Sequence, residues 1–96
     1  MIKVGKRWDN GAEYVGRGSP LGNPFVMKNE SERNTVCAQY DGWFHAKVRN
    51  NDPIIMAELI RLDKIHKSTG NLILGCYCAP KLCHGETIKS FLGLCA

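Results

Sequence analysis

A short apolar run at residues 71–78 constrains the fold of this chain more than any other feature. The run reads Asn-Leu-Ile-Leu-Gly-Cys-Tyr-Cys and does not alternate between polar and apolar residues. Such continuity is typical of a strand that is buried on both faces, as in a sheet covered by helices. A chain of 96 residues is long enough for one modest core, so we expect a single domain over residues 1–96.

Two long segments before this run have helical periodicity. Asn29 is the expected N-cap of the first helix, and Glu32 follows three residues later, as in a capping box. Asp52 and Pro53 predict the start of the second helix, as its N-cap and its first helical residue. Gly70 stands where a helix commonly ends. The apolar positions at helical spacing are Val36, Tyr40, Trp43, Phe44 and Val48 in the first segment, and Ile55, Leu59, Leu62 and Ile65 in the second.

Two strands and a third helix complete the expected fold. Residues 2–8 alternate as in a strand, and Asp-Asn-Gly at residues 9–11 predicts a hairpin to a second strand at residues 12–16. A terminal helix is expected over residues 86–92. This order predicts an α/β fold, with a small mixed sheet of about three strands and about three helices in a Rossmann-like layer. If the second and third strands are parallel, the long helices form their right-handed crossover. The loops after both strands then meet at the edge where such folds bind ligands.

The first of these loops, residues 16–25, is rich in glycine and proline. Its glycines allow close backbone approach, and Arg17 offers a planar set of donors for a phosphate or a carboxylate. The loop contains neither a Walker A motif nor GxGxxG, so no nucleotide chemistry follows from the pattern. A tight loop that packs on itself, with Arg17 solvated or paired to an acid, is the alternative. The candidate ligand-binding residues are Arg17, Gly18, Ser19, Gly22 and Asn23, with Gly85 from the second loop.

The second loop, residues 76–85, holds three of the five cysteines. The odd number of cysteines and the absence of a signal-peptide pattern favour reduced thiols in the cytoplasm. By residue type, a complete tetrahedral zinc set is present: Cys76, Cys78, Cys83 and His84. However, Cys76 and Cys78 on one strand lie about 6–7 Å apart, whereas two ligands of one zinc need sulfurs within ~4 Å. Zinc therefore requires a bend at Gly75 or Pro80.

The same loop also suits an anion or a reactive thiol. Cys83, His84 and Gly85 lie where the last helix should begin, and its N–H groups and dipole favour negative charge there. This field lowers the pKa of a thiol, so Cys83 and His84 are the candidate catalytic residues, as nucleophile or acid/base. In the plain structural alternative, the cysteines are buried core residues and His84 bonds a backbone carbonyl.

Charge and the remaining residues say less about function. The net charge of +4 suits an anionic small molecule, and no apolar run approaches the ~20 residues of a membrane helix. Nucleic acid is not the expected partner, because such a claim needs clustered charge with interleaved aromatic residues. Trp8 offers a stacking surface, but a contact inside the hairpin is the favoured interpretation. Cys37 and Cys95 are expected to be structural or incidental.

The two loops resemble a small-protein family of phages and bacteria, the domain of unknown function 4326. The resemblance rests on the motifs at residues 14–25 and 74–85 and, with the order of elements, covers most of the chain. Members often carry Trp where Tyr77 stands, with no evident chemical consequence. The resemblance implies a compact α/β fold in which both loops act together, and it supplies no reaction.

Two classes of function follow from these observations. The first is a cytoplasmic domain that binds a phosphorylated or nucleotide-like ligand between loops 16–25 and 76–85, with Cys83 and His84 available for chemistry. The second is a phage-encoded, zinc-stapled interaction or inhibitor protein without catalysis, located in the host cytoplasm and partnered by a protein. Zinc would then stabilise a small core. The sequence leaves open whether the protein is an enzyme.

Overall fold

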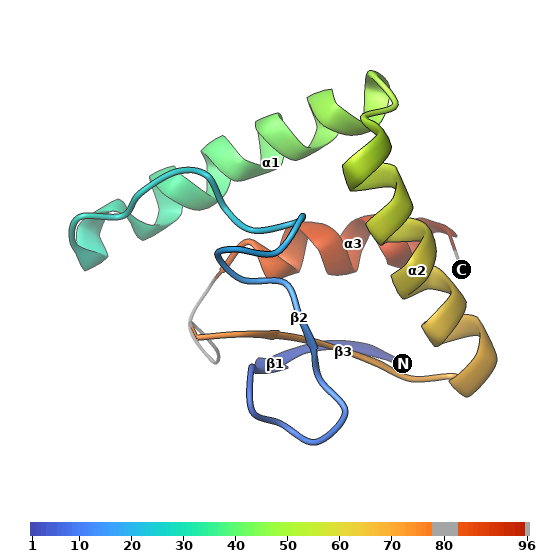
Figure 1. Ribbon diagram of the computed structural model, residues 1–96. Helices are drawn as coiled ribbons and strands as arrows, with labels where there is room; N and C mark the ends of the chain where they lie inside the picture. Colours follow the sequence, from blue (N-terminus) through green and yellow to red (C-terminus); the bar gives the residue numbers. More distant parts are fainter. Residues whose placement is uncertain (78–82, 96) are drawn as a thin grey trace.

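Three parallel strands and three helices form the fold of the described part of the chain (Figure 1). The computed structural model describes residues 1–77 and 83–95, with the side chain of Cys95 excepted. The strands are β1 (Ile2–Lys6), β2 (Glu13–Tyr14) and β3 (Leu72–Cys76), in the order β1-β3-β2. The predicted α/β fold with three strands and three helices is confirmed for this part of the chain, and the apolar run supplies the central strand.

The predicted hairpin between the first two strands is wrong. Both outer strands instead run parallel to β3, with Lys6 opposite Cys76 and Tyr14 opposite Gly75. The sheet is therefore parallel rather than mixed. The turn sequence at residues 9–11 predicts that the chain reverses locally, but it does not determine which strands pair. The buried strand β3 pairs with one outer strand on each side.

Residues 7–12 carry the chain across β3, on the side of the sheet away from the helices (Figure 1). The crossing passes directly over Gly75. A β-carbon at this position would lie 3.0 Å from the Ala12 Cβ, 3.0 Å from the Arg7 Cα and 3.1 Å from the Lys6 carbonyl oxygen. A side chain at Gly75 would therefore crowd the crossing chain, which explains why glycine is favoured at this position.

The second long helix begins and ends where the local sequence predicts. The capping box expected at Asn29 is wrong, because the Glu32 carboxylate accepts from the Lys28 N–H at 2.9 Å. The last helix extends past the expected residues 86–92, to Cys95. A 3₁₀ turn (Glu30–Glu32) precedes α1 (Arg33–Arg49), and the Asn29 side chain accepts from the Ser31 N–H at 3.1 Å. The helix α2 (Pro53–Thr69) has Asp52 as its N-cap, and Gly70 ends it at a φ of 76°. The last helix is α3 (Gly85–Cys95). Within the described residues, none of these helices has the length and apolarity that a bilayer crossing requires.

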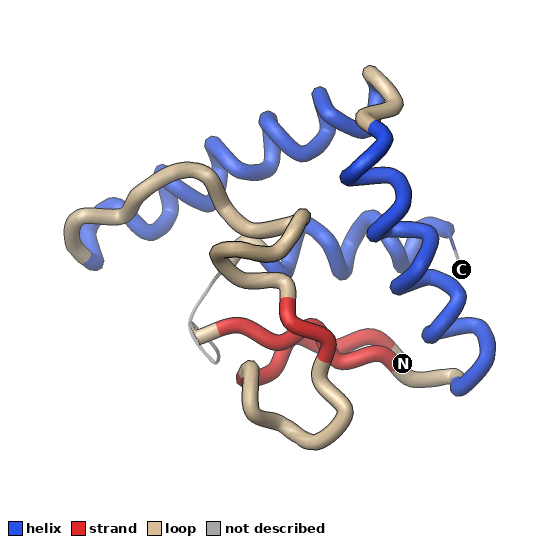
Figure 2. The backbone as a smooth tube through the Cα atoms, in the orientation of Figure 1, coloured by secondary structure: helices blue, strands red, loops and turns tan. Residues whose placement is uncertain are grey.

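All three helices lie on the same side of the sheet (Figure 2). α3 packs on β1 and β3, α2 packs on β3, and α1 packs on the two other helices. This two-layer arrangement does not by itself confirm the expected Rossmann-like layering, which places helices on both faces. The largest fully buried side chains of the core are Tyr40, Phe44, Leu21, Leu62, Leu74, Ile88 and Leu92.

The crossing over β3 gives a direct test of the fold. Gly75→Ala should lower the free energy of unfolding by about 1–3 kcal/mol, because two of the three crowding atoms belong to the backbone. Gly42→Ala is the matched control, since Gly42 lies in α1 with no atom within 4 Å of an added β-carbon. The control should instead stabilise the protein by about 0.5–1 kcal/mol. Urea denaturation measures both, and equal effects would contradict the crossing.

Candidate functional site

A pocket of about 270 Å³ lies beyond the carboxyl ends of β2 and β3. Because the strands are parallel, the segments that follow them meet at this edge. One wall comes from residues 16–27, another from the start of α1, and the rest from the end of β3 and the residues before α3. The predicted site residues that line it are Arg17, Asn23, Cys76, Cys83 and His84.

The other predicted ligand-binding residues do not line this pocket. The Ser19 hydroxyl donates to the Gly16 carbonyl at 2.7 Å, so it closes a turn of the loop. A β-carbon on Gly22 would lie 2.5 Å from the Gly16 carbonyl oxygen, where the loop folds back on itself. Gly18 has a φ of 94° in an exposed turn, and Gly85 packs α3 against Val4 of β1.

Two side chains of the loop, Arg17 and Asn23, line the pocket and keep donor groups there. Arg17 is exposed and forms no ion pair or side-chain hydrogen bond with the residues that the structure describes. The Asn23 Oδ1 accepts from the Phe25 N–H at 2.9 Å, which leaves the amide NH₂ of Asn23 as a donor. The loop therefore packs on itself, as the alternative interpretation expected, and still presents Arg17 and Asn23 to the pocket.

His84 is a buried anchor of the site, with 7% of its surface exposed. Its Nε2 lies 2.6 Å from the Val15 carbonyl oxygen, just after β2. Because a carbonyl can only accept, Nε2 is the donor in this hydrogen bond. The imidazole thus joins the start of α3 to the chain that leaves β2, and its role as an acid or base stays a prediction.

Tyr40 of α1 binds the loop at residues 16–25, which we call the Gly/Pro loop. Its hydroxyl donates to the Leu21 carbonyl at 2.7 Å, and both residues are fully buried. The Tyr40 ring meets the His84 ring edge-on, with 4.9 Å between the centroids. Burial raises the pKa of Tyr40 well above its ordinary range, and the nearby Cys83 raises it further. Tyr40 is therefore a neutral donor that fixes the loop.

Cys76 and Cys83 bring two buried thiols together at the base of the pocket. Their sulfurs lie 3.0 Å apart, and neither residue forms a disulfide. The Cys83 sulfur also accepts from the Gly85 N–H at 3.4 Å. The amides of Glu86 and Thr87 bond the carbonyls of residues 83 and 84. The first amides of α3 are thus occupied, so the start of this helix offers its dipole but no open N–H groups.

The predicted zinc set is only partly within the described residues. Cys78 lies outside the described residues, and the predicted distance between its sulfur and that of Cys76 stays a prediction. Within residues 1–77 and 83–95, no group of three His, Cys, Asp or Glu side chains is placed to hold a metal ion. His84 would have to use Nδ1, because its Nε2 is bonded to Val15. The four-ligand zinc site stays a prediction.

One of three comparisons with known proteins identifies a family for this chain. The family model described as Domain of unknown function (DUF4326) matches residues 2–93. The chain belongs to this family. No curated protein and no solved structure matches it.

In this DUF4326 chain, α1 contributes pocket residues that the sequence analysis did not assign. Arg33 and Cys37 both line the pocket, one helical turn apart. The Arg33 side chain is 15% exposed, and its Nη2 lies 2.8 Å from the Glu30 Oε1. The available signal was their helical spacing to the buried Tyr40, which places all three on one face of α1. Cys37, expected to be structural or incidental, is therefore a wall of the pocket.

Removing the Tyr40 hydroxyl tests how the loop is held. Tyr40→Phe should lower the free energy of unfolding by about 1–3 kcal/mol, because the buried Leu21 carbonyl then loses its donor. Tyr14→Phe is the matched control, since its hydroxyl donates to the Arg17 carbonyl at an exposed position. We expect the control to change stability by less than about 0.5 kcal/mol. Urea denaturation separates the two variants, and equal losses would contradict a buried anchor at Tyr40.

The raised pKa of Tyr40 adds a pH dependence. In the unfolded chain Tyr40 ionises near pH 10, whereas burial keeps it neutral in the folded protein. The resulting stabilisation is complete below about pH 10 and is lost as the pH rises further. The stability difference between the wild type and Tyr40→Phe should be constant from pH 7 to about 9 and shrink above about 10. A difference that stays constant at high pH would show that Tyr40 is not desolvated.

Proposed function

We propose that this protein binds a phosphorylated, nucleotide-like ligand in the pocket between the loop at residues 16–25 and the described ends of the second loop, residues 76–77 and 83–85. The observation that carries the proposal is the pair of donors, Arg17 and Asn23, at a pocket beside the start of α3. Arg17 supplies a charge that no described acid neutralises. A bidentate guanidinium is well suited to a phosphate group.

The walls of the pocket support a ligand with an apolar or planar part. Phe25, Met27 and Val36 line it beside the polar donors. Its volume of about 270 Å³ is slightly below the usual range for small-molecule sites, about 300–1,000 Å³. A phosphate with an attached sugar or base is therefore the class of ligand that we propose, with the remainder extending out of the pocket.

The geometry favours binding over catalysis. Cys83 has only 3% of its surface exposed, and its sulfur contacts Cys76 and the Gly85 N–H. The Nε2 of His84 is engaged by Val15. A nucleophile or a general base must reach the reacting atom, so chemistry at Cys83 or His84 requires a ligand that enters deeply.

Substitution of Arg17 tests the proposal. Isothermal titration of the full chain with nucleoside 5′-monophosphates, the matching nucleosides and inorganic phosphate should identify at least one phosphorylated ligand. Arg17→Gln should weaken that ligand about tenfold, which corresponds to ~1.4 kcal/mol. Arg49→Gln is the control, because Arg49 is an exposed cation at the far end of α1. Failure of every phosphorylated ligand to bind, or unchanged binding in Arg17→Gln, would contradict the proposal.

A zinc-stapled interaction or inhibitor protein is the second candidate. The Cys76 and Cys83 sulfurs lie 3.0 Å apart, inside the ~4 Å limit for two ligands of one zinc, which favours this candidate. Metal analysis of protein purified without chelator or histidine tag decides between the two. One zinc per chain with loss of folding on chelation would support this candidate, and the partner would then be a protein. Metal-free, folded protein would exclude it.

A further inference from the structure

A row of alternating cations and aromatic rings lies beside the pocket. The Lys6 Nζ is 5.3 Å from the Trp8 ring centroid. The Arg7 guanidinium carbon is 4.6 Å from the centroid of the Tyr14 ring and 5.5 Å from that of Tyr77. We call these five residues, Lys6, Arg7, Trp8, Tyr14 and Tyr77, the stacking surface. Its rings are also neighbours, because the Tyr77 centroid lies 6.1 Å from that of Trp8 and 6.2 Å from that of Tyr14.

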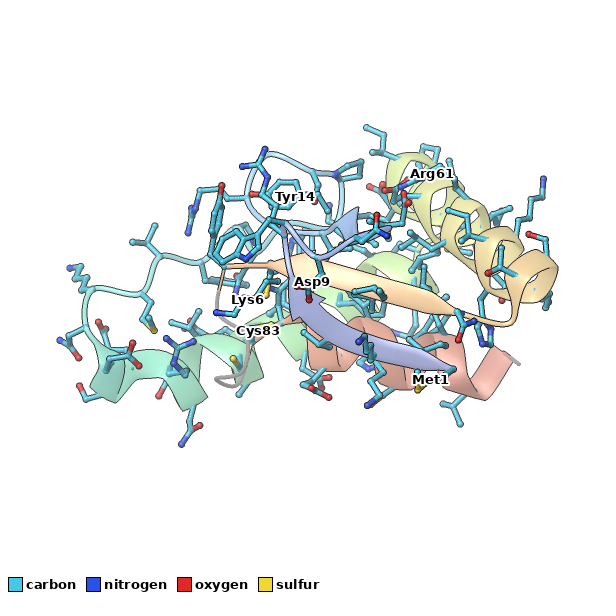
Figure 3. The ribbon with its side chains drawn as sticks, turned by 90° about the horizontal axis from the view of Figure 1, so that it is seen from below. Met1, Lys6, Asp9, Tyr14, Arg61 and Cys83 are labelled. Atoms are coloured by element: carbon cyan, nitrogen blue, oxygen red, sulfur yellow. The ribbon has the colours of Figure 1, made fainter. Side chains whose placement is uncertain are left out.

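The fold builds this surface from three separate segments. The crossing at residues 7–12 brings Arg7 and Trp8 over the end of β3, where Gly75 leaves space. Tyr77 follows β3 on the same face as Gly75, by the alternation of a strand. Figure 3, which looks onto the face without helices, shows Lys6 and Tyr14 near the carboxyl ends of β1 and β2.

The rings are exposed but held in position. Trp8 has 65% of its surface exposed and Tyr77 has 58%. Arg7 donates to the Tyr77 hydroxyl, so the guanidinium also orients that ring. Because most of the Trp8 side chain is exposed, it contributes little to the core. Its ring instead contacts Lys6 and Tyr77. Flat apolar faces are thus presented to solvent next to one another.

The charge around these rings is mainly positive. Lys6, Arg7 and Arg17 lie in or next to the stacking surface, since Tyr14 donates to the Arg17 carbonyl. The nearby acid is Asp9, whose carboxylate accepts the backbone N–H of Lys6 at 2.9 Å. Glu13 is bonded to Arg61 of α2 at 2.7 Å. Exposed aromatic faces with interleaved cations complement planar bases joined by phosphodiesters.

We infer that the stacking surface binds unpaired nucleobases of single-stranded nucleic acid. Bases stack on Trp8 and Tyr77, while Lys6 and Arg17 meet the phosphates. Tyr77 also lines the pocket. One end of a nucleic-acid strand bound on this surface would therefore lie at the pocket. That continuity rests on the proposed function, whereas the stacking itself does not. Because two rings are exposed, a dinucleotide is the smallest ligand that uses both.

Fluorescence anisotropy with labelled oligonucleotides tests the inference. The probes are homopolymeric single strands of DNA and RNA of about ten nucleotides, and a DNA duplex of equal length. We expect single strands to bind more tightly than the duplex, and Trp8→Leu and Tyr77→Leu each to weaken them about tenfold or more. Trp8→Phe should restore part of the affinity because it keeps a ring. Equal affinity for DNA and RNA would support stacking, and so would a preference for one of them. A preference would also show which nucleic acid the surface selects.

Two control variants separate stacking from general effects. Ile54→Ala removes an exposed apolar side chain of α2 and should leave the affinity unchanged. Lys6→Gln should reduce the salt dependence of binding, whereas Lys64→Gln on α2 should not. Thermal melting of each variant confirms that it is folded.

The outcomes distinguish this inference from the proposed function. No binding of single strands, or affinities unchanged in folded Trp8→Leu and Tyr77→Leu proteins, would overturn the inference. Mononucleotide binding that depends on Arg17 would still stand in that case. Conversely, single strands that bind through Trp8 while no mononucleotide binds would support the stacking surface and contradict the pocket.

Discussion

The parallel pairing of β3 with both neighbours is the constraint on which the rest of the structure depends. It forces β1 and β2 to point the same way although only residues 7–12 join them, so the chain must cross β3 over Gly75. It also places the segments after β2 and β3 at one edge. The pocket, the buried thiols and the exposed rings all lie near that edge as a result.

Buried hydrogen bonds then fix the loops that the sheet brings together. Tyr40 holds the Leu21 carbonyl, and His84 holds the Val15 carbonyl. The two rings also contact each other. α1, the Gly/Pro loop and the start of α3 are thereby linked through two side chains. This explains how a small chain keeps an irregular loop in one conformation beside a pocket, with Arg17 left exposed.

The sequence predicts the parts of the fold that depend on neighbours along the chain. The caps at Asn29, Asp52 and Gly70 act within one turn, and the apolar run identifies β3 without any partner. The hairpin failed because strand pairing is non-local: residues 9–11 do form turns, but the pairing energy lies with β3. At the site, the Gly/Pro loop pointed to Arg17 and Asn23. Arg33 and Cys37 became visible only once α1 was placed against that loop, and the stacking surface only once the crossing was known.

The most direct test of the account is whether both loops respond to one ligand. An amide chemical-shift titration of ¹⁵N-labelled full chain with the nucleoside 5′-monophosphates measures this residue by residue. The account predicts that the amides of Gly16, Arg17, Asn23 and His84 shift together and saturate on one binding curve. Shifts confined to one loop, shifts centred on α2, or no shifts at millimolar ligand would contradict a single pocket at the carboxyl edge of the sheet.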